Sequence, residues 1–133
     1  MPSSLSDEMG FHPCHLWVRR CSETGEAHVG LSDFAQKQLG KIMYVDLPQA
    51  GTSIEADIPF GTVESFKVVS ELLAPVSGVV VDVNGSLKGQ ANLLNDDCYG
   101  AGWLVRIRVD ENADLSPLLT ADAYMQMLGA KAR

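Results

Sequence analysis

The chain is short of basic residues and has no long apolar segment. Its 133 residues include 10 Lys and Arg against 17 Asp and Glu, a formal net charge of -7 at pH 7. Nucleic acids and anionic membranes are bound by basic surfaces that neutralise phosphate, so this charge balance argues against both partners. No segment reaches the roughly 20 apolar residues of a membrane-spanning helix. We therefore expect no nucleic-acid partner and no membrane association.

Signal-peptide features and paired cysteines are also missing. The opening residues MPSSLSDEM lack a basic and an apolar region, so we expect a cytoplasmic protein. Three irregularly spaced cysteines, Cys14, Cys21 and Cys98, form no CxxC pair, and reduced thiols are expected. His12, Cys14 and His15 crowd together, but no distant residues complete a metal-ligand spacing. We predict no metal site.

The length and the distribution of polar residues predict one domain. Residues 1–10 are small, polar and acidic without periodicity, and we expect them to form a flexible tail. Residues 11–133 have the length of a single domain with one core.

Short strands with glycine and proline turns dominate the rest of the chain. Strands are expected at residues 16–20, 27–30, 42–47, 79–83 and 102–109, and on both sides of residues 64–67. This pattern, with a few helices, predicts a mainly β barrel or sandwich.

Local signals predict the helices and one turn. Ser32 is expected to cap a short helix that Gly40 ends in the left-handed conformation. The dipeptide Asn84-Gly85 predicts a tight turn. The pair Ser116-Pro117 and then Thr120 predict the starts of two short C-terminal helices.

Lys67 is the strongest candidate for a functional side chain. It ends the segment Glu64-Ser65-Phe66-Lys67 between two apolar runs, which fits the tip of a hairpin. A lysine at such a tip projects its amine into water, where a modifying enzyme can reach it. An unmodified surface lysine has the same local pattern. The local pattern alone therefore leaves both interpretations open.

Nine segments in order resemble the motifs of the glycine cleavage H-protein family, whose members are lipoyl carriers. The segments are HLWV (15–18), VGLSDFAQ (29–36), LG (39–40), DLP (46–48), VESFK (63–67), APVSG (74–78), VN (83–84), LN (94–95) and YGAGW (99–103). Each is weak alone, but the ordered set is specific and extends from about residue 15 to residue 128. The resemblance implies a lipoyl/biotinyl-like barrel-sandwich hybrid with short peripheral and C-terminal helices.

The resemblance also implies a site. Lys67 matches the family's lipoyl-bearing lysine, and Glu64 and Ser65 match the motif recognised before it. Glu71, Leu16 and Phe34 are expected to line a cleft that shelters the arm. The expected cofactor is covalent lipoate on Lys67. Biotin fits less well, because methionines typically flank a biotinyl lysine and Phe66 and Val68 stand there.

The implied function is that of a carrier, not of an enzyme. In the family the lipoyl arm accepts an aminomethyl group from glycine decarboxylase and delivers it to aminomethyltransferase, and dihydrolipoyl dehydrogenase then reoxidises the arm. A lipoate ligase or lipoyl transferase would attach the lipoate. The family precedent predicts a monomer.

One departure leaves the cargo open. The family usually has His-Glu-Trp where this chain has His15-Leu16-Trp17, so an acid expected beside the cationic amine is replaced by an apolar residue. A related branch carries sulfur on its lipoyl arm beside a heterodisulfide-reductase-like complex in sulfur oxidation, and needs no such acid. The roles of Cys14 and Cys98 remain open, and so does an unmodified interaction module.

Overall fold

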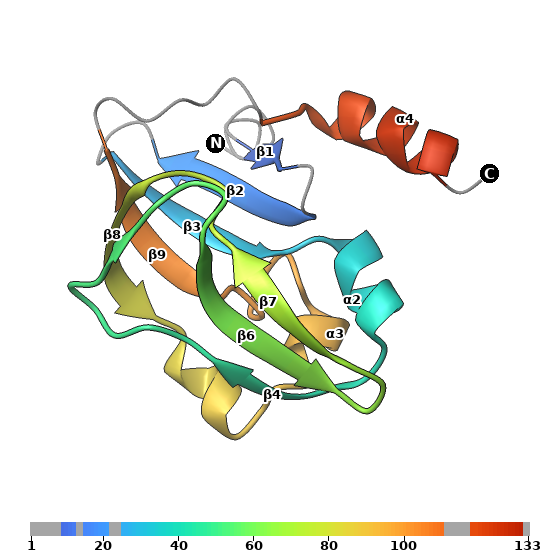
Figure 1. Cartoon of the computed structure of the whole chain (residues 1–133), viewed down its shortest axis with the longest axis horizontal. Helices are drawn as coiled ribbons and strands as arrows, with labels where there is room; N and C mark the ends of the chain where they lie inside the picture. Colours follow the sequence, from blue (N-terminus) through green and yellow to red (C-terminus); the bar gives the residue numbers. More distant parts are fainter. Residues whose placement is uncertain (1–8, 13–14, 22–24, 111–117, 132–133) are drawn as a thin grey trace.

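The computed structural model describes residues 9–12, 15–21, 25–110 and 118–131. Two antiparallel sheets face each other, and the smaller one lies in front in Figure 1. The larger sheet has the order β1 (Met9–Phe11), β2 (Leu16–Cys21), β3 (Glu26–Leu31), β9 (Val105–Val109), β8 (Gly78–Val83) and β5 (Ser53–Ile54). The smaller sheet has the order β4 (Ile42–Asp46), β6 (Pro59–Ser65) and β7 (Val69–Leu73). The predicted mainly β barrel-sandwich is confirmed.

Alternation along the strands places one apolar face of each sheet in the core. On β9, Val105 and Ile107 are fully buried, whereas Arg108 is exposed. On β6, Val63 is buried between exposed and half-buried neighbours. Successive side chains of a strand point to opposite faces, so both sheets contribute to one shared core.

Short helices connect and flank the sheets. They are α2 (Asp33–Leu39), the 3-10 helix η1 (Gly85–Lys88), α3 (Leu93–Asp96) and α4 (Ala121–Lys131). The hydroxyl of Ser32 accepts a hydrogen bond from the Ala35 N–H, as expected of an N-cap. Thr120 caps α4 in the same way, accepting from the Ala123 N–H at 3.1 Å. None of the helices in the described ranges is long and apolar enough to cross a membrane.

Trp17 organises the outer side of the large sheet. Its indole is fully buried and donates to the Cys98 carbonyl at 2.9 Å. Gly30 lies opposite it on β3, and a Cβ there would be 2.5 Å from the indole ring. Phe11 and Tyr124 stack nearby with ring centroids 4.7 Å apart, which fastens α4 to β1. A second apolar cluster thus lies between the large sheet and α4.

Several local expectations needed correction. Gly40 ends α2 with φ 79°, but its ψ of -156° is extended and not left-handed helical. Asn84 and Gly85 do not form a hairpin turn, because the Asn84 side chain accepts from the Ser86 N–H and starts η1. The strand expected at residues 102–109 begins only at Val105, and Leu104 before it is buried. Ser116 and Pro117 lie outside the described residues.

Candidate functional site

Ser65 shapes the tip of the β6–β7 hairpin. Its N–H donates to the Val68 carbonyl at 2.9 Å, and its buried hydroxyl accepts from the N–H groups of Lys67 and Val68, both at 3.2 Å. A serine hydroxyl that bonds backbone groups two and three residues ahead stabilises a tight turn. Ser65 therefore sets the backbone from which Lys67 projects.

Lys67 is exposed and lies beside the end of α2. A Cβ on Gly40 would be 3.2 Å from Lys67 Cε and 3.7 Å from its Nζ, so the lysine stem passes over a glycine. The Phe66 N–H donates to the Lys41 carbonyl at 3.3 Å, which joins the tip to the segment after α2. Within the described residues Lys67 forms no ion pair. Its amine is open to solvent.

Asn95 holds the segment beneath the tip. This α3 residue accepts from the Ile42 N–H at 2.9 Å and donates to the Gly40 carbonyl at 2.8 Å and to Gln36 Oε1 at 2.9 Å. One carboxamide thus joins α2, the α2–β4 connection and the first residue of β4. The sequence placed Asn95 within a family motif without a role, because its partners are 53 to 59 residues away.

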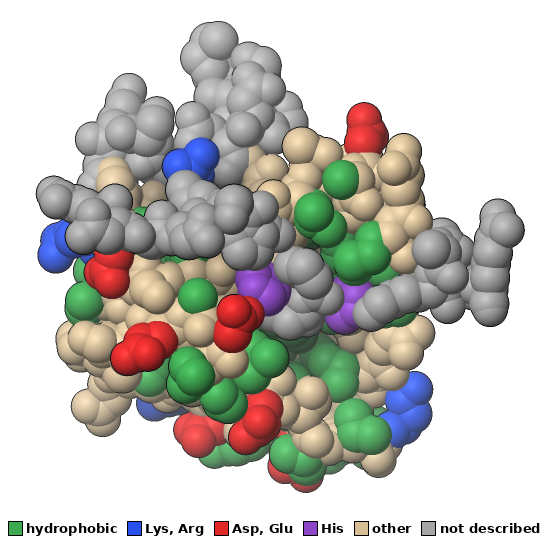
Figure 2. All heavy atoms as spheres, turned by 45° about the horizontal axis from the view of Figure 1, so that its top comes forward, with side chains coloured by type: hydrophobic (Ala, Val, Ile, Leu, Met, Phe, Trp, Pro, Cys, Tyr) green, Lys and Arg blue, Asp and Glu red, His purple; other side chains and the backbone are tan. Residues whose placement is uncertain are grey.

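The two acidic residues expected at the site share the outer face of the small sheet. Glu64 is exposed and lies opposite Tyr44 on β4 and Val69 on β7. Glu71 is also exposed and lies opposite Thr62. Acidic and hydrophobic side chains lie next to one another over the lower part of the surface in Figure 2. Phe66, Val68 and Val69 beside Lys67 are exposed as well, so the hairpin that carries Lys67 combines acidic with apolar side chains.

Leu16 and Phe34, both expected to line an arm cleft, have different environments. Leu16 is 3% exposed and belongs to the main core. Phe34 is half-buried, packs its ring 4.7 Å from that of His15, and lines a surface pocket whose lining does not include Leu16. The structure brings Phe34 to a pocket and Leu16 to the interior.

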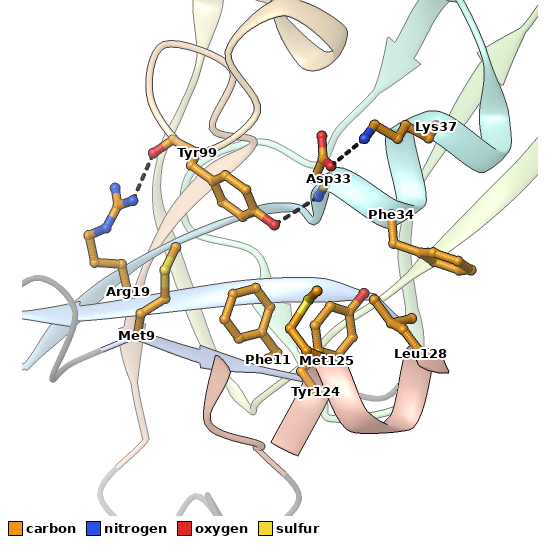
Figure 3. A pocket seen from close by; sticks show the side chains of 10 residues that line it. All are labelled: Met9, Phe11, Arg19, Asp33, Phe34, Lys37, Tyr99, Tyr124, Met125 and Leu128. Atoms are coloured by element: carbon orange, nitrogen blue, oxygen red, sulfur yellow. Dashed lines mark hydrogen bonds and ion pairs between the residues drawn. The ribbon is translucent and has the colours of Figure 1, made fainter. Parts of the chain in front are cut away.

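That pocket lies between α4, α2 and the edge formed by β1 and β2 (Figure 3). It has a volume of about 420 Å³, and most of its lining is aromatic and aliphatic. Its charged lining residues are Arg19, Asp33 and Lys37. Lys37 pairs with Asp33 at 3.0 Å. The hydrogen bond from Lys37, followed by that from Gln36, lowers the pKa of Asp33.

His12 and His15 have structural partners, and Cys98 is buried. His12 Nε2 is 2.9 Å from Asp57 Oδ1, and His15 Nδ1 is 2.8 Å from the Tyr124 hydroxyl. Burial raises the pKa of Cys98 to about 11, so this thiol is protonated at neutral pH. No group of His, Cys, Asp and Glu that could hold a metal was found among the described residues, and Cys14 lies outside them.

Comparison with known proteins assigns the family. The model of the family described as "Glycine cleavage H-protein" matches residues 10–131. The chain belongs to this family. Its sequence is 45% identical over 126 residues to the glycine cleavage system H protein of Chlorobium limicola, covering 95% of this chain and 98% of that protein. The H protein of Bacillus cereus is 44% identical over 124 residues, covering 93% and 96%.

A solved H-protein structure has the same fold. The crystal structure of the glycine cleavage system H protein from Mycobacterium marinum superposes with a TM-score of 0.81 at 33% identity. The match covers 92% of this chain and 97% of that chain. The match extends over both sheets, so the barrel-sandwich is a property of the H-protein family and of this chain alike.

Proposed function

We propose that this member of the H-protein family is a lipoyl carrier and that Lys67 receives the lipoyl group. The observation that carries the proposal is the position of Lys67: exposed, at the tip of a hairpin, in a chain of this family. A carrier must present its attachment amine to a modifying enzyme and then hold the arm on a rigid base. The backbone contacts of Ser65 supply such a base.

The residues around Lys67 fit an acylated lysine. The stem crosses Gly40, where a side chain would crowd it at 3.2 Å, so the absence of a Cβ leaves a path along α2. Acylation removes the positive charge of the amine. It breaks no ion pair among the described residues, because Lys67 forms none there. Attached lipoate would supply a disulfide that undergoes thiol–disulfide exchange.

The residues of the chain would then bind and orient the arm. Ser65 holds the turn, and Gly40 and Asn95 hold the segment over which the stem lies. Glu64 and Glu71 would be recognised by partners from the outer face of the small sheet. Phe34 would offer an apolar surface at the other end of α2.

We assign the cargo to the glycine cleavage system, as the carrier of the aminomethyl group. The support is the identity of 44–45% over most of the chain to proteins named as H proteins of that system. The expected partners are glycine decarboxylase, aminomethyltransferase, dihydrolipoyl dehydrogenase and a lipoate ligase or lipoyl transferase. The carrier has no catalytic residues of its own in this proposal.

Leu16 favours a second candidate, a sulfur carrier beside a heterodisulfide-reductase-like complex. At 3% exposure within the core, Leu16 offers no charge to a cationic amine. A sulfur cargo needs none. Leu16→Glu is a poor test, because a carboxylate in this core would be strongly destabilising. The wild-type chain should instead be compared directly with an authentic H protein in a glycine decarboxylase assay; equal rates would remove the support for sulfur carriage.

The attachment itself is tested by intact mass. Protein isolated from its native host should carry a lipoyl-sized increment that Lys67→Arg abolishes. Lys41→Arg is the matched control, because Lys41 is a neighbouring exposed lysine in the segment that contacts the tip. An unmodified native protein, or an increment that survives Lys67→Arg, would contradict the carrier proposal and leave an interaction module.

A further inference from the structure

The pocket between α4, α2 and the edge of β1 and β2 has a cationic end, Arg19, that pairs with none of the described acids. Arg19 lies at one end of the pocket, and Phe34 and Leu128 lie at the other (Figure 3). One Arg19 N–H donates to the Tyr99 carbonyl at 2.7 Å, and its guanidinium lies 4.8 Å from the centre of the Trp17 ring. Arg19 forms no ion pair with any described residue, and its Nε is buried without a hydrogen-bond partner there.

The row of side chains from Arg19 across the neighbouring strands carries one further permanent cation, Arg106, since burial lowers the pKa of His28 and favours its neutral form. His28 lies opposite Arg19 on β3, and Arg106 lies opposite His28 on β9. Among the described residues, the acids of this row lie at its far end: Glu26 is 3.3 Å from Arg106 Nε, and Asp82 lies opposite Arg106 on β8. Arg19 is therefore the cation of the row most distant from them. In a chain of net charge -7, Arg19 is thus a cation that forms no ion pair with the described acids.

The rest of the pocket suits an apolar chain. Its walls include the rings of Phe11 and Tyr124 and the side chains of Met9, Met125 and Leu128. Met125 is 63% exposed, so the apolar wall continues to the surface. The volume of about 420 Å³ lies within the range of small-molecule sites, which combine apolar walls with a few polar groups that set the orientation.

We propose that this pocket binds a medium-chain carboxylic acid non-covalently, with the carboxylate at Arg19 and the apolar chain between β1 and α4. Guanidinium and carboxylate form charge-assisted hydrogen bonds, and often two in parallel. The other two charged residues of the pocket, Asp33 and Lys37, pair with each other. An amine of the same length would place a cation beside Arg19 and is disfavoured. A ligand with a terminal anion and an apolar body fits both ends.

This pocket does not include the proposed attachment residue, although Phe34, proposed above as an apolar surface for the arm, lines it. The Lys67 stem lies against Gly40 at the end of α2, whereas Asp33, Phe34 and Lys37 line the pocket from another part of that helix. Neither Lys67 nor Gly40 lines the pocket. The inference goes beyond the carrier function and does not depend on lipoylation, although the free acid of a lipoyl group belongs to the same chemical class.

The test is titration of octanoate into full-length Lys67→Arg protein. Binding is monitored through the NMR signals of the pocket methionine methyls and of the Arg19 side chain. We expect saturable shifts, and affinity should rise by up to about fourfold for each added methylene from butanoate to octanoate. Arg19→Gln should weaken octanoate binding by about tenfold or more. The matched control is Arg20→Gln, an exposed neighbour on the same strand, which should bind normally.

The charge requirement is tested with octanol and octylamine. Octanoate binding that exceeds both, and that depends on Arg19, supports the proposal. Equal binding of octanol, or octanoate binding indifferent to Arg19→Gln, would show an unselective apolar cavity and overturn it. Absence of shifts at millimolar octanoate would overturn it too. Because the protein carries Lys67→Arg, none of these outcomes bears on lipoylation, which the intact-mass measurement tests separately.

Discussion

Asn95→Ala should destabilise the segment beneath Lys67 by more than the loss of an ordinary surface carboxamide would. The substitution removes the acceptor of the Ile42 N–H and the donor to the Gly40 carbonyl. Ile42 is 2% exposed, so its N–H has little access to water once Asn95 is gone. A buried backbone group left without a partner costs about 1–3 kcal/mol. With the loss of the Gly40 contact, we expect a decrease of about 2–3 kcal/mol in the free energy of unfolding.

Two measurements separate this support from general stability. Urea unfolding gives the change in free energy, and hydrogen exchange of the Phe66 amide, which donates to the Lys41 carbonyl, reports the contact between tip and support. Asn92→Ala is the control: the same substitution beside the same helix, at an exposed residue that donates to Asp96 at 3.0 Å. It should change stability by less than about 0.5 kcal/mol. Equal losses in both variants, or unchanged exchange at Phe66, would refute the reasoning.

Three further predictions concern the large sheet and Cys98, whose carbonyl accepts from the Trp17 indole. Gly30→Ala should lower the free energy of unfolding by about 3 kcal/mol, because the new Cβ would be 2.5 Å from the buried Trp17 indole. Gly85→Ala, whose new Cβ would meet nothing within 4 Å, should be nearly neutral in the same urea titration. Equal losses of unfolding free energy in the two variants would contradict this prediction. Burial, then repulsion from two arginines, lowers the pKa of His28 below 6.5. Its stabilising contribution is therefore complete above about pH 6.5 and is lost as the pH falls toward the folded-state pKa. His28→Gln should flatten that part of the pH–stability profile, and an unchanged slope would refute this prediction. The buried Cys98 thiol, with its pKa near 11, should resist alkylation at about pH 8 in the native protein and react after unfolding; rapid native alkylation would show that the site opens.

Much of the fold could be predicted because its signals are local. The hairpin of β2 and β3, the Ser32 cap of α2 and the Thr120 cap of α4 depend on residues within a few positions of one another. The strand expected at residues 102–109 was too long at its start, since β9 begins at Val105 and Leu104 before it is buried in the core. The tight turn expected at Asn84 was wrong, because its side chain bonds Ser86 and the carbonyls of Ala101 and Trp103.

The sequence by itself determined the family, through ordered motifs, and the hairpin position of Lys67, through two apolar runs around a polar tip. Only the tertiary structure decided what surrounds that lysine. Gly40 lies against Lys67 from 27 residues away, and Asn95 holds Gly40 in place. Leu16 and Phe34, both expected in one cleft, lie in the core and in a pocket. Motifs and turns arise from short-range sterics and hydrogen bonds, whereas the neighbours of an exposed side chain depend on how distant elements pack.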